Sequence, residues 1–162
     1  MDWYIHQKDS VVCFSLTSEK AAASFQVDYY EEAKRLSQIL LELPMSPSGT
    51  LRAHMDRNTI TVDRLVSESG VSIRTIKRLR NDPYYRPTKE NAIAICIGLQ
   101  LEPCFQKDWL RKLGIVLTSS SIDVLYDIIL TTMFRQPLST INLMLARYDI
   151  PPLSNGVDEL LR

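Results

Sequence analysis

We expect a mainly α-helical fold for this chain of 162 residues. Along most of its length apolar residues recur every three or four positions, which is the spacing of one face of an α-helix. Glycine is scarce, with 5 residues, whereas leucine, isoleucine and alanine are frequent. Prolines and glycines stand between the periodic segments, where they interrupt helices. These segments predict a small N-terminal part, a compact helical domain and a C-terminal helical region.

Residues 1–48 are expected to form the N-terminal segment, with one amphipathic helix. Aromatic and β-branched residues at Trp3–His6 and Val11–Phe14 favour a short hairpin, and an arm that orders against another chain is the alternative. From about Asp28 to Leu43, leucine and alanine recur at helical spacing. The proline and glycine residues in Met45–Gly49 then predict a linker and a domain boundary.

Three helices are expected before Pro83. The first runs from Thr50 to about Thr59. Thr61 is suited to cap the second, because its hydroxyl can accept a hydrogen bond from the first turn. Gly70 ends that helix, since glycine readily adopts the left-handed conformation found at helix C-termini. Ser72 can cap the third helix, so the pattern predicts a helix-turn-helix.

The third helix carries much of the positive charge. Residues 50–99 hold 9 basic and 5 acidic side chains, a net of +4, whereas residues 1–49 have a net of −3 and residues 100–162 a net of −1. Polar positions at i, i+3, i+4 and i+7 place four side chains on one outer face: Arg74, Lys77, Arg78 and Asn81. The inner side is apolar, with Leu65, Val71, Ile76 and Leu79. This arrangement is typical of proteins that enter the major groove of DNA.

From residue 50 to 102, including the segment PTKENAIAICIGLQLEP after the motif, the chain resembles the phage-repressor-like, Cro-type helix-turn-helix family (the xenobiotic-response-element family). The resemblance implies a lambda-repressor-like bundle over residues 49–102, closed by a fourth helix that starts at Pro87 and Thr88. It also implies a sequence-specific DNA-binding transcriptional regulator that places helix 73–81 in the major groove. Carried over by position, Ser72, Arg74 and Thr75 would lie nearest the bases, and Lys77, Arg78 and Arg80 nearer the phosphates.

A protein-interaction adaptor on the same scaffold, without sequence-specific DNA binding, is the alternative. The near-neutral total charge and the acidic N-terminal segment motivate it. So does Val62-Asp63-Arg64, which stands where members of the family often carry a glutamine that contacts phosphate. At the close helix contact Val66 replaces the usual small alanine.

Residues 103–162 are expected to form a C-terminal helical extension. Helices are predicted at Phe105–Leu113, at about Ile122–Arg135 and at Ser139–Tyr148, with a loose tail after Pro151-Pro152. The middle helix is apolar nearly all round, as in the centre of a bundle or in half of an interface. The segment from WLRKLGIVL onward loosely resembles helical tails appended to such domains in some bacterial and mobile-element regulators.

The partners that we expect are double-stranded DNA and a second copy of the chain, with a protein partner at the N- or C-terminal helices as a further candidate. A homodimer is expected because one small helix-turn-helix reads few bases. Two copies on a two-fold axis read half-sites about one DNA turn apart.

We expect no catalysis, cofactor or metal site. The two histidines, His6 and His54, belong to no HExxH motif, and Cys13, Cys96 and Cys104 show no CxxC spacing. No apolar run approaches the roughly 20 residues of a membrane span. The first residues lack a basic region followed by an apolar core, so we expect no secretory signal, no membrane partner and a cytoplasmic location.

Overall fold

The computed structural model of the chain describes residues 29–154. Within these residues every regular element is a helix and no strand occurs, which confirms the mainly α-helical class. The chain divides into two units, residues 1–42 and 43–162. The predicted hairpin around Trp3–Phe14 lies outside the described residues.

The described part of the first unit is a helix over residues 29–42, close to the predicted bounds. Ion pairs one turn apart cover its surface, between Glu31 and Lys34 and between Glu32 and Arg35. Such exposed pairs each stabilise a helix by only about 0.3–0.5 kcal/mol.

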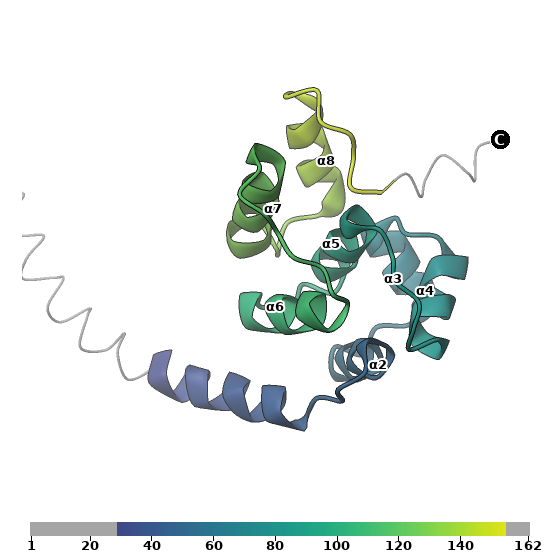
Figure 1. The fold of residues 1–162 in the computed structure, drawn as a ribbon, viewed down its shortest axis with the longest axis vertical. Coiled ribbons are helices and arrows are strands. Elements are labelled where there is room, and N and C mark those ends of the chain that lie inside the picture. The colour runs from purple at the N-terminus through teal and green to yellow at the C-terminus, as the bar shows by residue number, and fades with distance from the viewer. Residues whose placement is uncertain (1–28, 155–162) are drawn as a thin grey trace, which may run out of the picture. The chain divides into compact units, whose positions relative to one another are not determined.

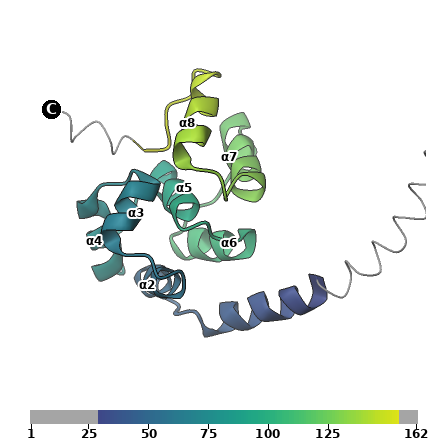
Figure 2. The same ribbon diagram turned by 180° about the vertical axis from the view of Figure 1, so that it is seen from behind.

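The second unit holds seven labelled helices in its described part (Figures 1 and 2). Its central helix is α5, which lies between α3 on one side and the pair α7 and α8 on the other (Figure 1). The residues of α5 from Ala92 to Gly98 are all buried, because a helix that is apolar all round has no face suited to water. The bounds are α2 Pro47–Arg57, α3 Val62–Ser69, α4 Ile73–Asn81, α5 Lys89–Gly98, α6 Pro103–Lys112, α7 Ser121–Thr132 and α8 Leu138–Ala146.

Two prolines that were predicted to interrupt the chain are instead the first residues of helices. Pro47 begins α2 behind Ser46, whose hydroxyl oxygen accepts a hydrogen bond from the Gly49 amide at 3.1 Å. Pro103 begins α6 two residues before the predicted start at Phe105. Proline fits the first turn because that turn needs no amide donor. The predicted linker at Met45–Gly49 is therefore wrong.

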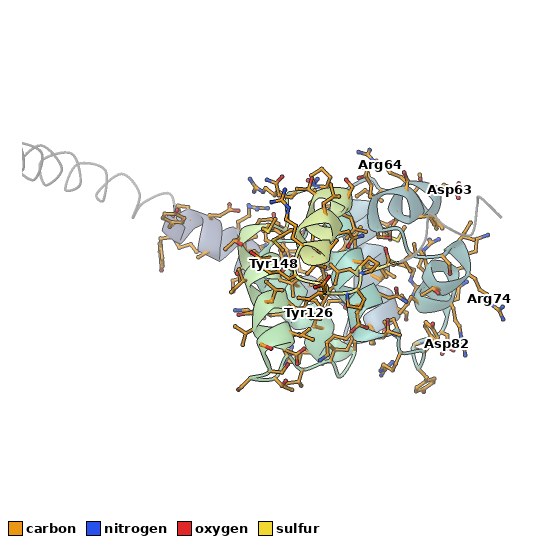
Figure 3. All side chains as sticks on the ribbon, turned by 90° about the horizontal axis from the view of Figure 1, so that it is seen from above. Asp63, Arg64, Arg74, Asp82, Tyr126 and Tyr148 are labelled. Atoms are coloured by element: carbon orange, nitrogen blue, oxygen red, sulfur yellow. The ribbon has the colours of Figure 1, made fainter. Side chains whose placement is uncertain are left out.

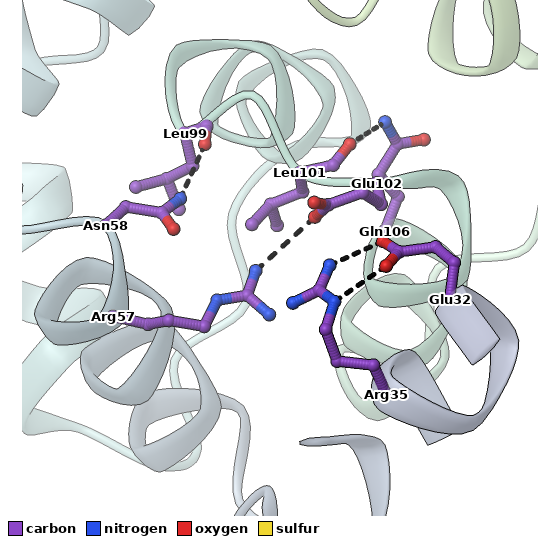
Figure 4. A network of polar contacts seen from close by, with 8 residues as sticks. All are labelled: Glu32, Arg35, Arg57, Asn58, Leu99, Leu101, Glu102 and Gln106. Carbon is purple, nitrogen blue, oxygen red and sulfur yellow. Dashed lines mark hydrogen bonds and ion pairs between the residues drawn. The ribbon is translucent and has the colours of Figure 1, made fainter. Parts of the chain in front are cut away.

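The start of α2 is also joined to α6. Trp109 donates a hydrogen bond from its indole nitrogen to the carbonyl oxygen of Pro47 at 3.0 Å. Farther along, Arg57 pairs with Glu102 at 3.5 Å, and Asn58 donates to the carbonyl of Leu99 at 2.8 Å (Figure 4). These contacts place α6 in the same unit as the helix-turn-helix, whereas the sequence predicted boundaries at residues 48 and 102.

Close packing of α5 against α3 depends on Gly98. A Cβ atom added at Gly98 would lie 2.8 Å from the Cβ of Ser69, closer than real Cβ atoms approach, and 3.0 Å from the Ser69 backbone nitrogen, which is also a tight contact. A glycine at this position therefore lets the two helices touch.

Gly98→Ala is expected to lower the free energy of unfolding by about 1–3 kcal/mol, although alanine is the better helix former. Urea denaturation followed by circular dichroism measures the loss. Ser69→Gly removes one of the two clashing groups, so the double variant should lose less than the sum of the single losses. Fully additive losses would contradict the close contact.

Helices α5 and α7 are joined at their first turns by a buried carboxylate. Asp123 accepts hydrogen bonds from the Lys89 ammonium at 2.7 and 2.9 Å and from the amide and hydroxyl of Thr118, both at 2.7 Å. The Lys89 and Thr118 bonds lower the pKa of Asp123 to about 2. Ser120 caps α7, since its hydroxyl oxygen accepts a hydrogen bond from the Asp123 amide at 3.2 Å.

Helix α7 buries one side in the bundle and exposes the other. Tyr126, Ile129 and Leu130 are buried in the bundle, whereas Val124 and Ile128 are 47% and 50% exposed. The helix ends at Thr132 rather than Arg135, and α8 ends at Ala146 rather than Tyr148.

The segment after α8 is packed against the bundle up to Ser154. The predicted loose tail after Pro151-Pro152 is therefore wrong for Leu153 and Ser154. Leu153 is 1% exposed, and its amide donates to the side-chain oxygen of Asn142 at 3.0 Å. Ser154 donates from its hydroxyl to the carbonyl oxygen of Ser69 at 2.8 Å. The segment therefore packs against the turn between α3 and α4.

Candidate nucleic-acid interface

The turn between α3 and α4 forms as its residues predict. Thr61 caps α3 by accepting from the Arg64 amide at 3.2 Å, and Ser72 caps α4 by accepting from the Thr75 amide at 3.2 Å. Between them Gly70 is left-handed, with φ of 60°. A residue with a Cβ would be strained there, so glycine suits this sharp turn.

The apolar sides of the motif are buried. Leu65 lies on α3, Val71 in the turn, and Ile76 and Leu79 on α4, each no more than 2% exposed. Their burial fixes the rotation of α4 about its axis and thereby decides which side chains face outward.

Four of the predicted residues share the exposed face of α4. Arg74, Lys77, Arg78 and Asn81 are all exposed, as their spacing predicts. Figure 3 shows Arg74 extending from α4 away from the other helices of its unit. No acidic residue occurs within α4, so the polar groups on this face are cationic donors and an amide.

Arg78 is held in place by the loop that follows α4. Its guanidinium lies 4.3 Å from the centre of the Tyr85 ring and 3.8 Å from the Asp82 carboxylate. Tyr84 in the same loop is 86% exposed, and Arg86 donates to the carbonyl of Pro83 at 2.9 Å. The loop that follows α4 thus carries an exposed aromatic ring, Tyr84, and an exposed arginine, Arg86.

The hydroxyls of Ser72 and Thr75 bond to each other at the start of α4, at 3.0 Å. Both residues are half-buried. Because the Ser72 hydroxyl donates to the Thr75 oxygen, the Thr75 hydroxyl keeps its own proton for a further acceptor.

Arg80 does not join the exposed face. It lies one turn after Ile76, on the inner side of α4, and is half-buried. Its Nε is shielded from solvent and has no hydrogen-bond partner within residues 29–154. The spacing from Ile76 predicts this orientation, because residues four apart share a helix face.

Sequence reasoning missed Ile73, which is 42% exposed. It lies four residues before Lys77, and so on the same side of α4. An apolar side chain on a groove-binding helix can contact the methyl group of thymine. The helical spacing from Lys77 could have identified it.

The front of α3 carries mixed charge. Asp63 lies exposed in the first turn of the helix, and Arg64 pairs with Glu68 at 3.8 Å. Figure 3 shows Asp63 and Arg64 on α3, apart from Arg74 on α4. A carboxylate at this helix end stabilises the helix but repels a phosphate.

No family model, curated protein or solved structure matches this chain. No helix within residues 29–154 has the length and apolar character needed to cross a membrane. In the same range, no group of three or more His, Cys, Asp or Glu side chains is placed to hold a metal ion. Burial raises the pKa of the Cys96 and Cys104 thiols, which are therefore protonated at neutral pH.

The exposed face of α4 has chemistry suited to DNA. An α-helix with its side chains is about 10–12 Å across and fits a major groove about 12 Å wide. An arginine there can donate two hydrogen bonds to guanine, and an asparagine can pair with adenine. Lysine supplies a mobile charge for phosphates.

Proposed function

We propose that the chain is a sequence-specific DNA-binding transcriptional regulator of the cytoplasm that acts by binding rather than catalysis. Helices α2 to α5 would form a lambda-repressor-like bundle that places α4 in the major groove. The observation that carries the proposal is the exposed face of α4, where Arg74, Lys77, Arg78 and Asn81 stand together without an acidic neighbour on the helix.

The positions along α4 suggest separate roles. Residues near the N-terminus of a recognition helix contact base edges, so Arg74 and Thr75 are assigned to bases. Ile73 adds an apolar contact on the same side. Lys77 and Arg78 are assigned to phosphates, because contacts to the backbone position the protein and supply much of the affinity.

Selection of bound DNA from a random pool, followed by titration at fixed salt, tests these roles. Arg74→Ala is expected to weaken binding to the selected site by about 1–3 kcal/mol and to relax the preference at one base pair. Lys77→Ala is expected to weaken binding to all DNA sequences alike and to reduce the dependence of the binding constant on salt concentration. Lys107→Ala, at an exposed lysine on α6, is the matched control. Binding by the two α4 variants that equals wild type would sink the assignment.

The exposed side of α7 supports the proposed homodimer. Beside Val124 and Ile128, the hydroxyls of Thr131 and Thr132 bond to carbonyl oxygens of their own helix, at 2.8 and 2.7 Å. The donors of these hydroxyls are therefore satisfied without water, and the one charged side chain on this exposed side is Asp127. A selected consensus with two-fold symmetry supports the dimer, whereas a single unrepeated half-site contradicts it.

An adaptor function is the second candidate, and Asp63 favours it. Its carboxylate lies exposed at the front of α3, where a phosphate contact would otherwise stabilise docking on DNA. Retention on heparin and a mobility shift with random-sequence DNA at low salt separate the two functions. Failure to bind any DNA at low salt favours a protein partner at the N- or C-terminal helices.

A further inference from the structure

The segment Pro151–Ser154, called here the C-terminal strap, connects α8 to the turn of the helix-turn-helix. At its α8 side, the Leu153 amide donates to the Asn142 side chain at 3.0 Å, and the Leu153 side chain is buried. At its other side, the Ser154 hydroxyl donates to the Ser69 carbonyl at 2.8 Å. The hydrogen-bonded residues Ser69 and Ser154 are 85 positions apart in the sequence.

The strap lies directly on the left-handed residue of the turn. A Cβ atom added at Gly70 would lie 2.5 Å from the Ser154 hydroxyl oxygen and 3.5 Å from the side chain of Leu138. Ser154 and Leu138 therefore cover Gly70 from the C-terminal part of the chain. The strap also lines a pocket with Ser72 and Thr75, at the start of α4.

Hydrogen bonds of two serines, Ser69 within the turn and Ser154 in the strap, stabilise the turn. The Ser69 hydroxyl donates to the carbonyl of Leu65 at 2.6 Å and accepts from the Val71 amide at 3.3 Å. The Ser69 carbonyl is one of the last in α3, where carbonyls lack partners within the helix, and Ser154 supplies its donor. Loss of the strap would leave this carbonyl unpaired and would uncover Gly70.

We propose that the C-terminal strap regulates the DNA-binding face, because it holds the turn that sets the orientation of α4. The inference rests on the proposed DNA-binding function. Only residues 147–150 separate the strap from α8, and the Leu153 amide is hydrogen-bonded to Asn142 on that helix. A partner that shifts α8 would therefore draw Leu153 from its buried position and loosen the turn. Occupancy of the C-terminal helices is in this way coupled to DNA recognition.

The coupling acts on specific binding rather than on all binding. Base readout needs α4 at a fixed angle in the groove, whereas attraction to phosphates depends mainly on the number of positive charges. Release of the strap changes no charge on α4. It should therefore weaken binding to the selected site and leave binding to random DNA nearly unchanged.

Full-length Leu153→Ala and Ser154→Ala variants test the strap, with Leu143→Ala, at an exposed leucine on α8, as the control. Dissociation constants for the selected site and for random DNA are measured at one salt concentration, and hydrogen exchange of residues 69–73 is followed without DNA. We expect specific binding to weaken by about tenfold for Leu153→Ala, with random binding within about twofold and faster exchange at the turn. Circular dichroism verifies the fold, and Ser154→Ala, which removes only one hydroxyl, reports on the turn if Leu153→Ala unfolds.

Equal weakening of specific and random binding, or unchanged exchange at the turn, would overturn the proposal. A wild-type chain that selects no DNA site overturns the proposed function and, with it, the regulatory role. These failures are distinguishable, because the exchange measurement reports on the strap without DNA and the wild-type titration reports on DNA binding without any change to the strap.

Discussion

Trp109→Ala will lower the free energy of unfolding by about 3–5 kcal/mol, in the range found for large-to-small substitutions of buried aromatic residues. Trp109 is 1% exposed, and its indole donates to the Pro47 carbonyl. Alanine leaves a cavity between α6 and α2 and removes the indole donor that binds the Pro47 carbonyl. Trp109→Phe retains most of the ring but not the donor, so it should cost about 1–2 kcal/mol.

Urea denaturation, followed by two independent spectroscopic probes, measures the loss in the free energy of unfolding and also tests the domain organisation. If α6 belongs with the helix-turn-helix, both variants shift one cooperative transition of the whole second unit. A separate domain ending at residue 102 would instead keep its own transition unchanged when Trp109 is replaced. The two-probe measurement therefore compares the predicted boundary at residue 102 with the single unit of the structure.

Acidification from pH 7 to pH 4 will destabilise the fold through His54. This histidine is buried, and neither ring nitrogen has a hydrogen-bond partner within the described residues. Burial is the main cause that lowers its pKa to about 4, and the positive charge of Arg57 adds to it, while Asp108 acts in the opposite direction. The ring centre lies 5.2 Å from that of Phe105, in an apolar setting that disfavours an imidazolium.

The sign follows from proton binding in the two states. Unfolded His54 binds a proton near its ordinary pKa of about 6.5, whereas folded His54 binds one only near pH 4. Between these values the unfolded chain holds more protons, so stability is complete above about pH 7 and is lost as the pH falls towards 4. The full loss is about 3 kcal/mol at most.

Urea titrations at pH 7, 6, 5 and 4 measure the slope. In His54→Leu the slope between pH 7 and 5 should largely disappear, because leucine does not titrate. Asp123 has a folded pKa of about 2 and contributes its loss below pH 4, outside this window. An equal slope in wild type and His54→Leu would show that another group is responsible.

Local hydrogen-bonding signals correctly predicted the starts of α3 and α4 and the turn between them. Thr61 and Ser72 cap their helices and Gly70 is left-handed, since each of these roles depends on a few neighbouring residues. Proline was less informative. Pro47 and Pro103 resemble interruptions, yet each begins a helix, because the first turn and a helix break both suit a residue without an amide donor.

The outer face of α4 could be predicted and its inner face was partly misread. Helical spacing brought Arg74, Lys77 and Arg78 together, and the structure places them so. The same spacing, counted from Ile76 and Leu79, predicts that Arg80 lies on the inner side of α4 and that Ile73 lies on the outer side. Arg80 was assigned to the DNA-binding face because of its charge, and Ile73 was left out because it is apolar.

By itself the sequence determined the helical class, the turn at Gly70 and the basic face of α4, because these follow from periodicity and from bonds within a few residues. Only the tertiary structure showed that α6 joins α2 through Trp109 and that Ser154 covers the turn. Those contacts connect residues 62 and 85 positions apart, and no local pattern marks them. They depend on which surfaces become buried together when the helices pack, and the amphipathic pattern of one helix does not specify its partner.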